Sequence, residues 1–302
     1  MARADSPVYS GLFPVAPTPF TESGDLDLEN QKRALDYMID HGVGGICILA
    51  NYSDQFLLSE KERDRLVDLR QSHVVAGRRP VMVICNHFSS WIAEERARYA
   101  SGRGASLSML MPPYHGMGLP ADEAGISVVL PSLAKIPIMV QDTPLSGVML
   151  AVFGAFSPRG AARQLFQDRS AFCRGKTPFA DRSRWRAIVS PFDGEEAITM
   201  MADFDAGVTG TMPSALLPDL LRDVIENHKA GRRADAAATS TRVLPLINFE
   251  NRQRGLRAAK SVMAEGKIIK CEAMCHPLEQ IHPDTRPGLI ELAREASRLA
   301  LH

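Results

Sequence analysis

The amino-acid sequence predicts an α/β protein, a (β/α)8 TIM barrel with a C-terminal helical extension. Short apolar runs of strand length alternate with stretches whose apolar residues recur at helical spacing. So many such units in 302 residues favour a closed eightfold barrel over an open sheet. No GxGxxG turn follows the first apolar run, which argues against a dinucleotide-binding fold.

The first half of the chain repeats this strand-helix unit regularly. Buried parallel strands read as continuous apolar runs, and here each run ends in proline or in polar residues. We expect strands at 11–20, 43–50, 80–85, 105–111 and 137–142. The helix after the second strand should begin at a capping box formed by Ser59 and Glu62.

The pattern breaks between Ala151 and Ala187, where arginines are interleaved with aromatic residues without clear periodicity. We expect no regular sixth strand flanked by two helices there, because unpaired buried charge costs about 3–5 kcal/mol. Strands resume at 188–193 and 207–212, and helical patterns at 195–204, 220–229, 234–244, 255–264 and 289–299. Residues 1–215 should therefore form the barrel with a disrupted sixth unit, and 216–302 its last helix and the extension.

Composition indicates small-molecule chemistry. Lys+Arg and Asp+Glu both total 35, so no basic field favours nucleic acid or a membrane surface. No segment has the length of a membrane span or the form of a signal peptide. The five scattered cysteines suit reduced thiols and a cytoplasmic location. Cys271 and Cys275 with His276 and His282 match no common zinc spacing, so we expect no metal and no cofactor.

Polar residues follow the expected strands at the end where barrel enzymes carry their sites. They offer hydroxyls, amides, imidazoles and a phenol but no arginine or lysine, which favours a small neutral or carboxylate-bearing substrate. Each has a structural alternative: a histidine beside a strand can be a hydrogen-bonded support, Tyr114 can pack in the core, and the acidic run from Asp193 can open a helix. The catalytic candidates are His87, Tyr114, His115 and Gln141, and the substrate-binding candidates are Thr18, Asn51, Tyr52, Ser53, Asp142 and Thr211.

Several motifs together resemble the dihydrodipicolinate synthase and N-acetylneuraminate lyase superfamily. They are ILANYSDQF, MPPYHG, QDTPLSG, PFDGEEAI, GVTGTM and PLINFENRQ. Within it the chain is most similar to 2-keto-3-deoxy-L-arabonate dehydratases, over all but residues 151–187. The resemblance implies a homotetramer and a Schiff base between a strand-six lysine and the substrate 2-keto group. The imine would acidify the C3 proton and let the C4 hydroxyl leave as water, giving 2-oxoglutarate semialdehyde.

The resemblance also assigns roles. Asn51, Tyr52 and Ser53 occupy the position that holds the substrate carboxylate. A tyrosine proton relay often stands where this chain has Gln141, which leaves His87 and His115 to move protons. Other members imply alternatives: a ketodeoxyglucarate dehydratase, a dihydrodipicolinate synthase-like enzyme or a pyruvate aldolase.

The expected lysine is missing, because Lys176 is the only lysine between Ala151 and Ala187 and lies in no FKIE-like strand. One explanation is a lysine-less relative, a catalytically dead barrel that binds a ligand or assembles with active paralogues. The other is a segment read in the wrong frame. Shifted by one base, residues 165–170 can encode YFKIE, and the flanking residues can encode helices on both sides. We favour paired compensating frame changes near Leu150 and Ile188.

Overall fold

The computed structural model describes residues 9–74, 79–111, 136–142, 164–168, 191–194 and 196–296. Its 8-stranded sheet has the order β1-β8-β7-β6-β5-β4-β3-β2, and every neighbouring pair is parallel. A parallel bridge from Val15 to Cys47 joins the first strand to the second, so the sheet closes on itself and confirms the expected barrel. The strands are β1 (Gly11–Leu12), β2 (Ile46–Ile48), β3 (Val81–Ile84), β4 (Leu107–Leu110), β5 (Ile138–Asp142), β6 (Gln164–Asp168), β7 (Pro191–Asp193) and β8 (Gly210–Thr211).

Side chains alternate along each strand between the barrel interior and the layer beneath the helices. Cys47 and Met82 belong to the inner cluster, whereas their neighbours Ile46 and Val81 belong to the outer one. Phe192 packs edge to face on Phe13, the interior residue directly after β1, at 5.2 Å between ring centroids. A Cβ on Gly210 would lie 2.5 Å from the Phe192 ring, so this close packing requires glycine there.

Helices surround the barrel, and their starts follow the local sequence. The expected capping box is confirmed: the Ser59 amide donates to Glu62 Oε2 at 2.8 Å, and the Glu62 amide donates to Ser59 Oγ at 3.3 Å. The barrel helices are α1 (Leu28–Asp40), α2 (Glu60–Val74), α3 (Ser90–Gly102), α6 (Met200–Ala206) and α7 (Pro218–Lys229). The helix after β7 begins at Met200, later than the expected 195.

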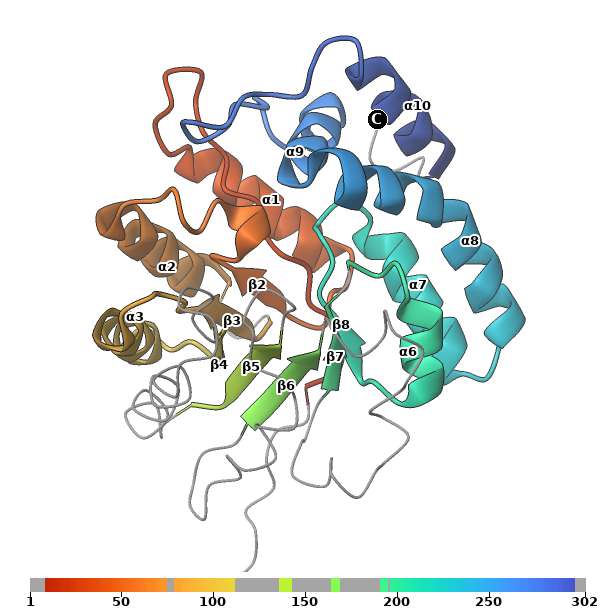
Figure 1. The fold of residues 1–302 in the computed structure, drawn as a ribbon, viewed down its shortest axis with the longest axis horizontal. Helices are drawn as coiled ribbons and strands as arrows, with labels where there is room; N and C mark the ends of the chain where they lie inside the picture. The colour runs from red at the N-terminus through yellow and green to blue at the C-terminus, as the bar shows by residue number, and fades with distance from the viewer. Residues whose placement is uncertain are drawn as a thin grey trace, which may run out of the picture.

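A helical extension follows the last barrel helix, as expected. It contains α8 (Arg233–Phe249), the π-helix η5 (Glu250–Arg254), α9 (Leu256–Glu265) and α10 (Arg286–Ala296). Figure 1 shows these helices in blue, with α9 beside α1. The contact is apolar, because Ala34 of α1 clusters with Met263 and Ile269. The division at 215/216 stays a prediction.

We expected no regular sixth strand flanked by two helices within residues 151–187, and the structure does have a strand there. Strand β6 runs from Gln164 to Asp168 and pairs along its length with β5, and then with β7. The reason lies in the backbone, because without a sixth strand the facing edges of β5 and β7 would have unpaired N–H and C=O groups. The strand itself contains none of the arginines. The flanking parts of the segment lie outside the described residues.

Three further properties concern only the described part of the chain. No helix there is both long enough and apolar enough to cross a membrane. No group of three or more histidine, cysteine or acidic side chains there could hold a metal ion. Cys47, Cys85, Cys271 and Cys275 are free thiols.

Candidate active site

The loop after β2 lies at the mouth of the barrel and is held by two buried hydroxyls. It contains the short helix η1 (Asn51–Ser53). Thr18 Oγ1 donates to the Ser53 carbonyl at 2.9 Å, and Ser53 Oγ donates to the Ala16 carbonyl at 2.5 Å. Both hydroxyls therefore donate their hydrogen to backbone carbonyls and hold the loop in place. In the same loop Asn51 is exposed, and Tyr52 packs partly against the interior cluster.

A buried ion pair fixes the end of this loop to the helical extension. Asp54 follows η1 in a left-handed conformation, and its Oδ2 lies 3.0 Å from Lys260 Nζ on α9. Both side chains are completely buried, and the ammonium lies 4.7 Å from the centre of the Phe20 ring. Burial raises the pKa of Asp54 and lowers that of Lys260, while the attraction between them opposes both shifts. Sequence patterns gave no signal for this pair.

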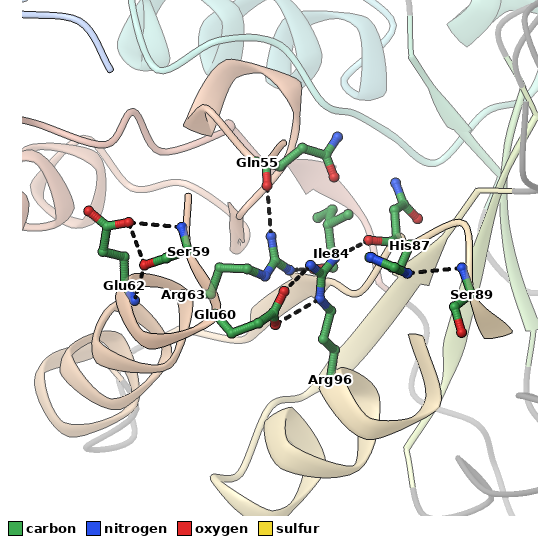
Figure 2. Close-up of polar contacts among 10 residues, drawn as sticks. Gln55, Ser59, Glu60, Glu62, Arg63, Ile84, His87, Ser89 and Arg96 are labelled. Carbon is green, nitrogen blue, oxygen red and sulfur yellow. Dashed lines mark hydrogen bonds and ion pairs between the residues drawn. The ribbon is translucent and has the colours of Figure 1, made fainter. Parts of the chain in front are cut away.

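His87 follows β3, and its imidazole has a defined acceptor atom. Its Nδ1 accepts a hydrogen bond from the Ser89 amide at 2.9 Å (Figure 2). Burial, and next the positive charge of Arg96, lower the pKa of His87, which favours the neutral ring. In a neutral ring whose Nδ1 accepts, Nε2 carries the hydrogen. His87 can thus donate a hydrogen bond from Nε2.

Two arginines that sequence reasoning missed support the neighbouring strand end. Arg63 is buried, and its guanidinium donates to the Ile84 carbonyl at 2.9 Å and to the Gln55 carbonyl at 3.2 Å (Figure 2). It therefore ties β3 to the loop after β2. Arg96 donates to Glu60 Oε2 at 3.1 Å and also to the Asn86 carbonyl. Burial lowers the pKa of Arg63 to about 10, which leaves the guanidinium charged at neutral pH.

Gln141 is brought to the interior, whereas Thr211 is not. Gln141 is buried near the end of β5, two residues after Met139 of the inner cluster and therefore on the same face. Thr211 pairs with Leu12 of the outer cluster, and its Oγ1 donates to Asp193 Oδ2 at 2.6 Å. In the register of the sheet, Asp142 of β5 pairs with Asp168 of β6. The same row continues through Asp193 of β7 to Thr211 of β8. Tyr114 and His115 lie outside the described residues.

A second acidic group lies where the extension meets the end of β8. Glu250 is buried, and the Ser214 hydroxyl donates to its Oε2 at 2.9 Å. Burial raises the pKa of Glu250 to about 8, although the hydrogen bond from Ser214 lowers it; the charge of Glu196 raises it further. The adjacent Asn251 amide donates to Glu196. These contacts attach η5 to the barrel.

Comparisons with known proteins identify the family. The model of the "Dihydrodipicolinate synthetase family" matches residues 8–152. An L-2-keto-3-deoxyarabonate dehydratase of Azospirillum brasilense is 44% identical over 311 residues, covering 100% of this chain and 99% of that protein. The chain belongs to the dihydrodipicolinate synthetase family.

Solved structures agree with the family's fold. A dihydrodipicolinate synthase from Aquifex aeolicus superimposes with a TM-score of 0.86 at 16% identity, covering 97% of this chain and 99% of that one. A sialic acid aldolase of Ruminococcus gnavus, described as a catalytic lysine mutant, gives a TM-score of 0.84 at 18% identity, with 95% of each chain covered. Both show the barrel fold of this family.

The register of β6 shows which position would carry the expected lysine nucleophile. In the shifted reading YFKIE, the lysine takes the place of Gln167. That position pairs with Gln141 on β5 and with Phe192 on β7, which both belong to the interior row. The written chain thus carries an amide at a strand end where the shifted reading carries an amine.

Proposed function

We propose that this protein is a carbon-oxygen lyase that dehydrates 2-keto-3-deoxy-L-arabonate to 2-oxoglutarate semialdehyde through a Schiff base. The observation that carries this proposal is the 44% identity, over essentially the full length of both chains, to a dehydratase described as acting on that compound. The same resemblance supports a role in pentose catabolism, and we expect no cofactor. A small 2-keto acid is the only ligand that this chemistry requires.

The mechanism needs an amine at the end of β6. Attack by the amine on C2 expels water and leaves a protonated imine, which accepts the electron pair when the C3 proton departs. The base that took the C3 proton returns it to the C4 hydroxyl, which leaves as water while a double bond forms between C3 and C4. The Nε2–H group of His87 can donate a hydrogen bond to this hydroxyl. A hydrogen of C5 and the proton of its hydroxyl then shift to C3 and C4, which turns C5 into the aldehyde. Hydrolysis of the imine releases 2-oxoglutarate semialdehyde and the amine. The backbone of the η1 loop would hold the carboxylate throughout.

Three observations support a frame change as the reason that the amine is missing. The family match stops at residue 152, close to the proposed upstream change near Leu150. Strand β6 falls on the residues that the shifted reading turns into YFKIE. The written frame also puts three aspartates, Asp142, Asp168 and Asp193, in one register row of the sheet, whereas the shifted reading has isoleucine at 168.

Turnover and trapping together test the proposal. The written chain and a frame-restored chain are incubated with 2-keto-3-deoxy-L-arabonate, and separately with pyruvate and borohydride. Only the frame-restored chain should turn over and gain a covalent adduct. A Lys176→Ala variant is the control: strong activity of the written chain that disappears in this variant would overturn both the frame argument and the assignment of the nucleophile.

A second candidate is a catalytically dead barrel that binds a ligand or assembles with active paralogues. It is favoured by one observation, the absence of lysine from the sequence of β6. Binding of a 2-keto acid without an adduct, in both the written and the frame-restored chains, would support it over the dehydratase. Another lyase or aldolase of the family would instead form the adduct but act on a different 2-keto acid.

We further propose a homotetramer in the cytoplasm. Large apolar side chains are exposed around the start of α3, with Trp91 75% exposed and Phe88 stacked on Phe56 at 6.4 Å between ring centroids. Exposed aromatic side chains of this kind are typical of a surface that is buried against another copy of the chain. The free buried thiols of Cys47 and Cys85 support a reducing compartment.

A further inference from the structure

A second pocket opens beside the barrel mouth, between η1 and the junction of η5 with α9. Its volume is about 430 Å³, within the usual size of small-ligand sites. Asn51 and Tyr52 form one wall, and Asn251, Arg252 and Arg257 form the other. Tyr52 also packs partly against the interior cluster, so this pocket borders the candidate active site.

Two positively charged side chains line the pocket, the exposed Arg252 and the partly buried Arg257. Among the residues that the structure describes, no carboxylate forms an ion pair with Arg252 or Arg257. The pocket also contains the start of α9, where Gly255 provides no side-chain cap for the first amides of the helix. Two guanidinium groups and a helix N-terminus create a local positive potential in a chain of zero net charge.

The backbone break at Gly255 shapes this wall. Its φ of 57° and ψ of −137° separate the π-helix from α9, in a region essentially restricted to glycine. The break lets Arg252 from one helix and Arg257 from the next line the same pocket.

The two walls are held together before any ligand arrives. The buried Asp54–Lys260 ion pair links the end of η1 to α9, and the hydrogen bond from Asn251 to Glu196 fixes the start of η5. A preformed site spends less of its binding energy on ordering its own side chains.

We propose that this pocket binds a small dicarboxylic acid, with Arg252 and Arg257 as its cationic partners. Guanidinium groups suit carboxylates because their planar N–H forks match the two oxygens. Two arginines and a helix terminus can compensate two negative charges, whereas one carboxylate would leave an arginine unmatched. The acid either lies wholly in the pocket or extends a keto end into the barrel mouth. This inference is independent of the proposed Schiff base, since binding here is not covalent.

Isothermal titration calorimetry on the full written chain tests the inference with three probes. Glutarate and 2-oxoglutarate carry two carboxylates, and 2-oxopentanoate has the same carbon chain with one. Wild type should bind a dicarboxylate at least about tenfold more tightly than 2-oxopentanoate, roughly 1.4 kcal/mol. Equal affinities for glutarate and 2-oxoglutarate would mean an acid wholly inside the pocket; tighter 2-oxoglutarate would mean one that reaches the mouth.

Variants assign the binding to this pocket. Arg252→Gln and Arg257→Gln should each weaken dicarboxylate binding, and the double variant should remove the preference over 2-oxopentanoate. Arg242→Gln, at an exposed arginine of α8, is the matched control and should bind as wild type. Failure of wild type to prefer dicarboxylates, or an unchanged preference in the double variant, would overturn the inference. Borohydride trapping of the frame-restored chain tests the proposed function separately.

Discussion

At the scale of single residues, position 167 decides whether imine chemistry is available. Gln167→Lys should place an amine in the register row of Gln141 and Phe192. It should form a borohydride-trapped adduct with pyruvate and raise turnover by about tenfold or more, because imine formation lowers the barrier to losing the C3 proton. Gln167→Met has similar length without the amine and should do neither. An adduct in the frame-restored chain but none in Gln167→Lys would contradict the register argument.

Lys260 stabilises the fold through its buried partner. Lys260→Met should lower the free energy of unfolding by about 3–5 kcal/mol, because Asp54 would stay buried without its counter-charge. Urea unfolding measures the change. Adding Asp54→Asn to this variant should recover part of the loss, since no unpaired charge then remains. A loss below about 1 kcal/mol in the single variant would show that water solvates Asp54.

Glu250 should make stability depend on pH. Its pKa is raised to about 8 from the usual 4.5 of a glutamate, so between these values the folded state holds a proton that the unfolded state has lost. The stabilisation is complete below about pH 4.5 and is lost as pH rises through about 8. The slope should approach 1.4 kcal/mol per pH unit, about one proton. Glu250→Gln, measured by urea unfolding from pH 5 to 8, should remove this slope; an identical slope in the variant would assign it elsewhere.

At the scale of elements, the start of α2 rests on its capping box. Ser59→Ala removes the hydroxyl that accepts from the Glu62 amide, and should cost about 1 kcal/mol of unfolding free energy. Thr241→Ala, at an exposed position within α8, leaves no helix start uncapped and should cost nothing measurable. Thermal unfolding of both variants compares them directly. Equal stabilities would mean that water replaces the Ser59 cap.

At the scale of the whole molecule, the exposed aromatic residues bear on assembly. Light scattering on the purified protein should give four times the chain mass. Trp91→Glu should shift the mass downward, because it places a charge on a side chain that is 75% exposed in the isolated chain. Thr241→Glu is a control on α8. A monodisperse monomer in wild type would contradict the tetramer, and a tetramer unaffected by Trp91→Glu would place the interface elsewhere.

The sequence by itself determined the fold class, most strands and helices, and the capping box at Ser59, because these depend on local periodicity and on contacts between near neighbours. It missed β6, because that strand is selected by the backbone hydrogen bonds of β5 and β7 and not by its own pattern. Only the tertiary structure paired Asp54 with Lys260, 206 residues apart, and brought Arg63 to the end of β3 and the loop after β2. It also showed that Thr18 and Ser53 hydroxyls hold the loop backbone and that Thr211 binds Asp193. Spacing along a chain cannot reveal such pairings, because they depend on which face of each element the closed barrel turns toward its neighbours.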